Sequence, residues 1–226
     1  MSRPRTRLYL ITPPRIDDIQ AFAIVLGRTL QAGDVACLQM RMKGEDGETP
    51  DLDAMRAVAK AILPLCHEFE VAAVVNDSID VALETGADGV HLGQDDGTVK
   101  DARARLGPDA IVGATCHDSR HLAMIAGEQG ADYVAFGAFH DTSTKSPKTK
   151  AEPELLTWWQ DVMELPCVAI GGVDASNAGA LSLAGADFVA ASSAVWGHPD
   201  GPAAGVQAIN AALDEAAATF PADTVA

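Results

Sequence analysis

The chain of 226 residues is 48% hydrophobic and carries a net charge of −16, from 32 acidic and 16 basic side chains. Such a charge excludes binding to nucleic acid or to anionic membranes through a broad basic surface. A local group of cations can still bind a small anion. No apolar run approaches the ~20 residues of a membrane span, and the four cysteines show no CxxC spacing. We therefore expect a cytoplasmic protein with reduced thiols.

Short apolar runs alternate with amphipathic segments along the chain. The runs predict strands at Leu8–Ile11, Ala36–Met40, Val71–Val75, Gly89–Leu92, Ile111–Ala114, Tyr133–Phe136, Cys167–Ile170 and Phe188–Ala191. Amphipathic segments such as 51–69 and 119–130 lie between the runs and predict helices. Because the strands are apolar on both faces and most are followed by a helix, the pattern predicts a parallel sheet covered by helices.

Three stretches of the chain repeat one local pattern. They are TGADGVHL (85–92), QGADYVAF (129–136) and AGADFVAA (184–191). In each stretch we expect a glycine to end a helix in the left-handed conformation, before an Ala-Asp turn and a buried strand. The turn residues Asp88, Asp132 and Asp187 are therefore expected to be structural.

Eight strands connected by helices predict a (β/α)8 TIM barrel, which belongs to the α/β class. We expect a single domain over residues 1–226, with residues 214–226 as a frayed C-terminal tail. A doubly wound open sheet is the alternative. Its dinucleotide-binding form is disfavoured, because no GxGxxG follows the first strand.

Polar side chains cluster immediately after the predicted strands. In a barrel the carboxyl ends of all strands face one rim, where active sites form. The candidate site residues in these positions are Gln39, Arg41, Lys43, Asn76, Asp77, Asp96, Thr115, Thr142, Thr144, Lys145, Gly171, Gly172 and Ser193. Each of them taken alone has a structural explanation, such as a helix cap at Asp77, and His91 is expected to pack into the barrel. Their order on successive strands favours a site.

The chemistry of these residues fits two anion sites, one of them assisted by a metal ion. Three cations can neutralise a multiply charged anion, namely Arg41, Lys43 and Lys145. Mg²⁺ typically takes one or two carboxylates together with phosphate oxygens, and Asp77 and Asp96 could supply the carboxylates. The hydroxyls of Thr142 and Thr144 can donate hydrogen bonds to the oxygens of the multiply charged anion. The Gly171–Gly172 turn and Ser193 can surround a second phosphate without a metal.

The motifs formed by these residues make the sequence resemble the thiamine-phosphate synthases, over roughly Leu8 to Val195. The motifs are Gln-x-Arg-x-Lys at 39–43, Asn-Asp at 76–77, HLGQDD at 91–96, Thr-x-Thr-Lys at 142–145 and Ile-Gly-Gly at 170–172. The resemblance matches Asp96, rather than Asp95, to the family's metal ligand. The stretch GAFHDTSTK departs from the family, with Ala138 in place of a proline and His140 in place of an aromatic residue.

The resemblance implies a Mg²⁺-dependent transferase of thiamine biosynthesis. It would join 4-amino-2-methyl-5-hydroxymethylpyrimidine diphosphate to hydroxyethylthiazole phosphate and release diphosphate. The three cations with Asn76 and the metal would hold the diphosphate, and Gln39 and Thr115 would border the pyrimidine. The residues implied around the thiazole phosphate are Thr142, Thr144, Gly172 and Ser193. A thiazole tautomerase, a non-catalytic paralogue that binds thiamine phosphates and an unrelated phosphosugar barrel are the alternatives. The oligomeric state stays open, with a homodimer among the options.

Overall fold

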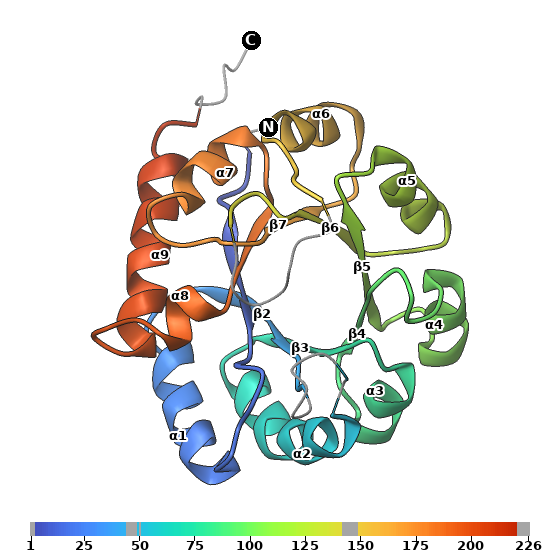
Figure 1. Cartoon of the computed structure of the whole chain (residues 1–226), viewed down its shortest axis with the longest axis vertical. Coiled ribbons are helices and arrows are strands. Elements are labelled where there is room, and N and C mark those ends of the chain that lie inside the picture. The colour runs from blue at the N-terminus through green and yellow to red at the C-terminus, as the bar shows by residue number, and fades with distance from the viewer. Residues whose placement is uncertain (1–2, 44–48, 50, 142–148, 221–226) are drawn as a thin grey trace.

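The computed structural model describes residues 3–43, 49, 51–141 and 149–220. Within these ranges the strands form a closed parallel barrel in chain order, and the helices surround it (Figure 1). The strands are β1 (Arg7–Ile11), β2 (Val35–Met40), β3 (Ala72–Asn76), β4 (Gly89–Leu92), β5 (Ile111–His117), β6 (Tyr133–Gly137), β7 (Cys167–Ile170) and β8 (Phe188–Ala191). The helices are α1 (Ile19–Leu30), α2 (Leu52–Glu68), α3 (Ile79–Thr85), α4 (Val99–Leu106), α5 (Arg120–Glu128), α6 (Glu154–Val162), α7 (Ala178–Ala184), α8 (Ser193–Trp196) and α9 (Pro202–Ala217).

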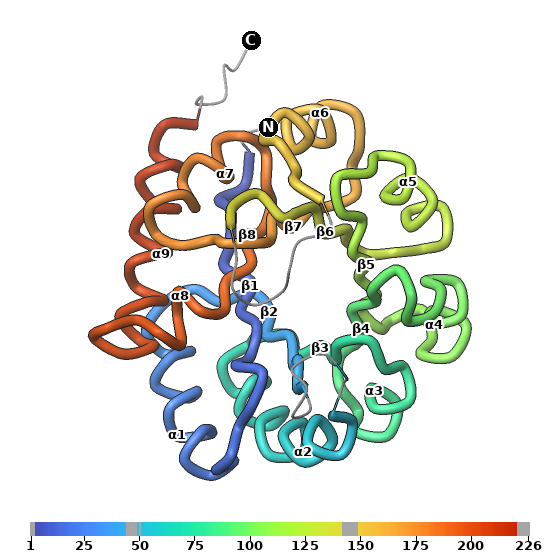
Figure 2. The backbone as a smooth tube through the Cα atoms, viewed as in Figure 1, coloured from blue at the N-terminus to red at the C-terminus, as the bar shows by residue number. Residues whose placement is uncertain are grey.

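The closure of the barrel decides between the two predicted folds. β1 pairs in parallel with β8, with Arg7 opposite Phe188 and Leu10 opposite Ala191. The backbone trace in Figure 2 shows β8 lying beside β1. The (β/α)8 prediction is therefore confirmed and the open sheet is excluded. β5 extends beyond its predicted end at Ala114, because a bulge near Thr115 lets it continue pairing with β6.

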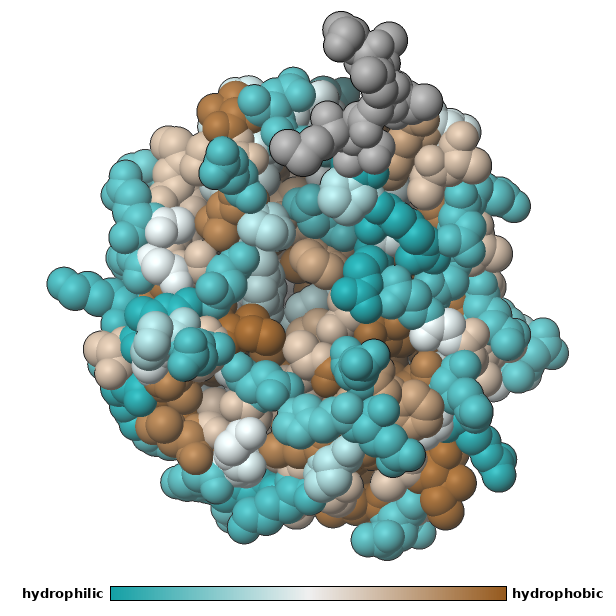
Figure 3. Space-filling view, turned by 180° about the vertical axis from the view of Figure 1, so that it is seen from behind, coloured by the Kyte–Doolittle hydropathy of each residue, from teal (hydrophilic) through white to brown (hydrophobic). Residues whose placement is uncertain are grey.

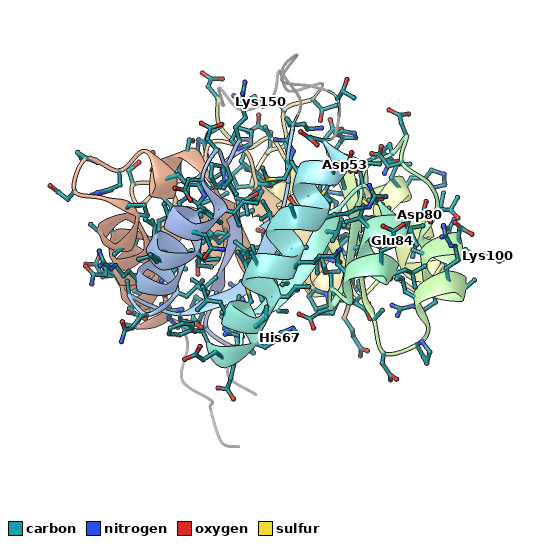
Figure 4. All side chains as sticks on the ribbon, turned by 90° about the horizontal axis from the view of Figure 1, so that it is seen from below. Asp53, His67, Asp80, Glu84, Lys100 and Lys150 are labelled. Carbon is teal, nitrogen blue, oxygen red and sulfur yellow. The ribbon has the colours of Figure 1, made fainter. Side chains whose placement is uncertain are left out.

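The three repeated stretches are built as predicted. Their glycines all have positive φ, at Gly86 (71°), Gly130 (93°) and Gly185 (127°). Each aspartate carboxylate accepts a hydrogen bond from the backbone N–H at the start of the preceding strand, at 2.7–2.8 Å, in the pairs Asp88–Ala73, Asp132–Val112 and Asp187–Cys167. Asp88 also contacts His67 at 3.0 Å, and Figure 4 places His67 at the opposite end of the barrel from Lys150. The aspartates thus tie the amino ends of the strands together.

The core has two parts, one inside the barrel and one between barrel and helices. The interior part is filled by Tyr9, Ile11, Cys37, Val74, Tyr133, Ala135, Val168 and Ala190. Outside, polar side chains cover much of the face seen in Figure 3, with apolar groups dispersed among them. All four cysteines are buried and unbridged. Burial raises the pKa of Cys66, for example, to about 12, so this thiol stays protonated.

The C-terminal segment corrects one prediction. The frayed tail does not begin at residue 214, because α9 continues to Ala217 and buries Ala216 against the core. Asp214 also accepts a hydrogen bond from Nε of Arg5 at 2.5 Å. Residues 221–226 lie outside the described part. Among the described helices, none combines the length and the apolar character needed to cross a membrane.

Candidate functional site

A cavity of about 210 Å³ opens at the carboxyl ends of the strands. Ten of the predicted site residues line it together, namely Gln39, Arg41, Lys43, Asn76, Asp77, Asp96, Thr115, Gly171, Gly172 and Ser193. They come from six strand ends and are far apart in the sequence, so closure of the barrel is what brings them to one place. The other three predicted residues, Thr142, Thr144 and Lys145, lie outside the described residues.

The basic wall of the cavity follows β2. The backbone N–H of Arg41 donates to the hydroxyl of the buried Thr12 at 2.9 Å, and that of Lys43 donates to the carbonyl of Pro14 at 2.8 Å. The segment after β1 therefore fixes the backbone that carries both cations. Burial lowers the pKa of the Arg41 guanidinium, while the charge of Asp77 acts in the opposite direction. Arg41 is accordingly a partly desolvated cation, which binds an anion more strongly than an exposed one.

Two carboxylates meet on the wall formed by β3 and β4. The side chains of Asp77 and Asp96 are in hydrogen-bonding contact, and burial together with the charge of Asp96 raises the pKa of Asp77 from 3.8 to about 6. The nearby charge of Lys43 opposes this rise. Asp77 also has a left-handed backbone with φ of 65°, and its N–H donates to the carbonyl of His91 at 2.8 Å. A conformation this unusual for a non-glycine residue costs on the order of 1 kcal/mol and is typical of functional sites.

Gly93 makes room for the carboxylate pair. A Cβ atom on Gly93 would lie 2.4 Å from Oδ2 of Asp96 and 3.6 Å from Oδ1 of Asp77. Any other residue would therefore push Asp96 away from its partner. Two hard oxygen ligands held side by side, open to the cavity, can bind a divalent cation that completes its shell with ligand oxygens and water.

The glycine turn after β7 packs directly against the segment that follows β6. Gly171 and Gly172 have φ of 98° and 64°, and a Cβ on Gly172 would lie 2.4 Å from the carbonyl oxygen of Asp141. The N–H of His140 donates to the carbonyl of Gly171 at 3.1 Å. Only glycine, which lacks a Cβ atom, allows the two segments to pack this closely. The segment 138–141 is thereby fixed at the edge of the cavity, with Ala138 in its lining.

The floor of the cavity is formed by β4 and β5. Thr115 and His91 both line it, and Nε2 of His91 lies 2.8 Å from Oγ1 of Thr115. The β5 bulge follows Thr115, and His117 beyond it has a left-handed backbone with φ of 53° and also lines the cavity. His91 was predicted to pack into the barrel, and it is buried there as well as reaching the cavity.

The lining also contains residues that the sequence did not single out as site residues. They include Ile11, Gly93, Gln94, Ala138, Val173 and Ser192. Gly93 and Gln94 fall inside the HLGQDD motif, and Ser192 adjoins the predicted Ser193. Their neighbours in the sequence could therefore have identified them as site residues. Ile11 and Val173 are ordinary apolar residues whose place is set only by the closed barrel.

Comparisons with known proteins agree with this geometry. The family model for thiamine monophosphate synthase matches residues 8–195. The chain is 58% identical to the thiamine-phosphate synthase of Hyphomonas neptunium, with 95% of this chain and 97% of that protein covered. It is 57% identical to that of Rhodospirillum centenum, with coverage of 90% and 96%. A solved structure, thiamine phosphate pyrophosphorylase from Pyrococcus furiosus, superposes with a TM-score of 0.79 at 29% identity, over 93% of this chain and 96% of that one. Matches of this extent and identity make the chain a member of the thiamine monophosphate synthase family.

Proposed function

We propose that the chain is a thiamine-phosphate synthase, a transferase that couples the pyrimidine diphosphate to the thiazole phosphate. The C–O bond between the pyrimidine methylene and the diphosphate breaks, and a C–N bond forms from that methylene to the thiazole nitrogen. Thiamine phosphate and diphosphate are the products. One observation carries the proposal: in a member of this family, Arg41 and Lys43, the carboxylate pair and the glycine turn line a single cavity.

The leaving diphosphate would lie against the basic wall. Arg41 and Lys43 would neutralise the charge that develops on it, and the amide of Asn76 would donate a hydrogen bond. The position of Asn76 supports this role, because it is 7% exposed and its Nδ2 donates to the carboxylate of Asp77. Lys145, which the sequence places on the loop after β6, is proposed as the third catalytic cation.

Asp77 and Asp96 would hold the metal ion, which we propose to be Mg²⁺. The donor set fits, because Mg²⁺ uses one or two carboxylates plus phosphate oxygens and waters rather than a cage made only of protein. In keeping with that, the described residues contain no group of three or more His, Cys, Asp or Glu side chains that could hold a metal ion. When bound, the ion supplies additional positive charge opposite the leaving group.

The protein's remaining task is to protect and align a cation. An electron-rich aminopyrimidine can stabilise positive charge at its methylene once diphosphate leaves, so no protein nucleophile is needed. Gln39 and Thr115 would border the pyrimidine, and the barrel interior beneath them, which is filled with side chains, keeps water away. The Gly171–Gly172 turn, Ser193 and the 142–144 hydroxyls would bind the thiazole phosphate and so align its nitrogen.

The closest alternatives make different use of the same cavity. A thiazole tautomerase would handle only the thiazole phosphate, and would leave the basic wall and the carboxylate pair unexplained. A paralogue that only binds thiamine phosphates would keep the cavity but would not convert the substrates. Small phosphorylated substrates also fit the expected cytoplasmic location.

The test is formation of thiamine phosphate by the purified chain with both substrates and Mg²⁺. Turnover is expected, and it should be lost with a chelator and in Lys145→Ala. Lys100→Ala is the matched control, because Lys100 lies exposed on α4, away from the cavity. Binding of either substrate without turnover would favour the paralogue and overturn the proposal.

A further inference from the structure

A continuous chain of hydrogen bonds crosses the barrel interior beneath the cavity. Oη of Tyr9 lies 2.8 Å from Oη of Tyr133, and that oxygen lies 2.9 Å from Nδ1 of His91. Nε2 of His91 lies 2.8 Å from Oγ1 of Thr115. Thr115 and His91 line the cavity, whereas Tyr9 and Tyr133 lie deeper, at 4% and 7% exposed. We call these four residues the relay.

Packing holds the relay in place. Tyr133 pairs across β5 and β6 with Gly113, and a Cβ on Gly113 would lie 2.0 Å from Cζ of Tyr133. The Tyr133 ring therefore occupies space on the neighbouring strand β5 that is open only because residue 113 is a glycine. The His91 ring stacks on it, with centroids 5.6 Å apart. Polar groups this deep in a barrel are costly unless hydrogen-bonded, so each proton in the relay needs an acceptor.

The protons of the relay can be arranged in two orders. Burial raises the pKa of Tyr9 and of Tyr133, so both phenols keep their protons. If Nδ1 of a neutral His91 carries the proton, it donates to Tyr133, which donates to Tyr9. Nε2 then accepts from the Thr115 hydroxyl, whose oxygen faces the cavity as an acceptor. If Nε2 carries the proton, every link reverses and Thr115 must donate into the cavity.

The chemistry of the proposed reaction favours the first order, because an aminopyrimidine that becomes cationic is stabilised by an acceptor and opposed by a donor. At the other end of the relay, Cys37 lies opposite Tyr9 in the β1–β2 register and in the same buried cluster, and a thiol sulfur is a weak acceptor for the last phenol proton.

We propose that Tyr133 and Tyr9 are positioning residues that act through His91, in its Nδ1–H form, to present the Thr115 hydroxyl as a hydrogen-bond acceptor to the pyrimidine. The inference rests on the proposed function for the identity of the substrate. The inference gives a role in the reaction to Tyr9 and Tyr133, which do not reach the cavity, and it assigns a direction to each hydrogen bond of the relay.

Steady-state kinetics test the role of the relay. Tyr133→Phe removes the acceptor of Nδ1–H, so we expect kcat to fall roughly 10- to 100-fold while KM for the thiazole phosphate stays unchanged. Tyr9→Phe acts one link further away and should cost less. Thr115→Val, which lacks the hydroxyl, should cost at least as much as Tyr133→Phe, and Thr115→Ser should restore most of the activity. Thermal unfolding of each variant separates these effects from loss of folding.

Nitrogen NMR of the histidine rings tests the direction of the relay without any substrate. In the wild-type protein we expect His91 to be protonated at Nδ1 and unprotonated at Nε2, with assignment by loss of the signals in His91→Gln. In Tyr133→Phe the proton should move to Nε2. A wild-type ring protonated at Nε2, or a kcat in Tyr133→Phe equal to wild type, would overturn the inference. Absence of wild-type turnover would instead refute the proposed function, and the NMR result would still decide the relay.

Discussion

Replacing Asp77 with asparagine is expected to stabilise the metal-free protein while removing the proposed metal site. Burial and the charge of Asp96 raise the pKa of Asp77 from 3.8 to about 6. At about 1.4 kcal/mol per pKa unit, this shift corresponds to on the order of 3 kcal/mol of lost stability. Solvent screening of a partly exposed carboxylate pair reduces the expected gain in Asp77→Asn to about 1–2 kcal/mol. Asparagine also tolerates the left-handed backbone at this position, so the substitution adds no strain.

The effect has a defined dependence on pH. The folded-state pKa of Asp77 lies above the unfolded value, so the penalty is absent below about pH 4, grows as the pH rises towards 6 and is complete above it. We therefore expect the Tm of Asp77→Asn, measured without metal at pH 8, to exceed that of wild type by about 2–8 °C. The difference should shrink by about half at pH 5.

Addition of Mg²⁺ should reverse this order. A bound ion stabilises the folded state by mass action, so the wild-type Tm is expected to rise with Mg²⁺ concentration while that of Asp77→Asn stays constant. Asp95→Asn is the matched control, since Asp95 lines the same cavity and is not assigned as a ligand; its response to Mg²⁺ should follow wild type. A lower Tm for Asp77→Asn at pH 8 without metal, or an equal response to Mg²⁺, would refute the reasoning.

Three further substitutions test the other walls of the cavity. Gly93→Ala places a methyl group 2.4 Å from Oδ2 of Asp96, so Mg²⁺ affinity measured by calorimetry should fall roughly tenfold or more. Lys43→Gln removes a proposed charged partner of the diphosphate and should raise KM for the pyrimidine diphosphate roughly 10- to 100-fold, leaving KM for the thiazole phosphate unchanged. In Gly172→Ala the new methyl group would clash with the carbonyl oxygen of Asp141, and the backbone φ of 64° is unfavourable for alanine. The free energy of unfolding should therefore fall by about 2 kcal/mol. Wild-type values of the affinity, KM or unfolding free energy in the respective variant would contradict these assignments.

The barrel and most of the site could be predicted because both depend on short-range patterns. Strands apolar on both faces need helices on one side and a closed interior on the other. Once the strands are placed, the residues after them must face one rim, which is why Arg41 and Asp77 could be assigned to one cavity from sequence. The glycines of the repeats were predictable for the same reason, since each sits at a fixed place in a local turn.

Features that depend on contacts across the barrel could not be predicted. The relay needs Tyr9 and Tyr133 to meet inside the closed barrel, and Gly113 gives no sign in the sequence that it makes room for a ring. The frayed tail was placed too early, at residue 214, because Asp214 on α9 contacts Arg5, which lies at the other end of the chain. Contacts between residues this far apart in the chain leave no periodic pattern in the sequence.

The local charge of the cavity explains how a chain of net charge −16 could bind a diphosphate. In the described part of the cavity, Arg41 and Lys43 are outnumbered by three carboxylates, those of Asp77, Asp95 and Asp96, so these five groups alone give no attraction for an anion. A divalent cation on Asp77 and Asp96 offsets two of the negative charges and leaves positive charge in excess. Diphosphate binding should therefore depend on the metal first and on Arg41 and Lys43 second. The same aspartates that are expected to weaken the metal-free protein would then make anion binding conditional on the metal, so we expect the chain to bind a diphosphate only when the proposed metal site is filled.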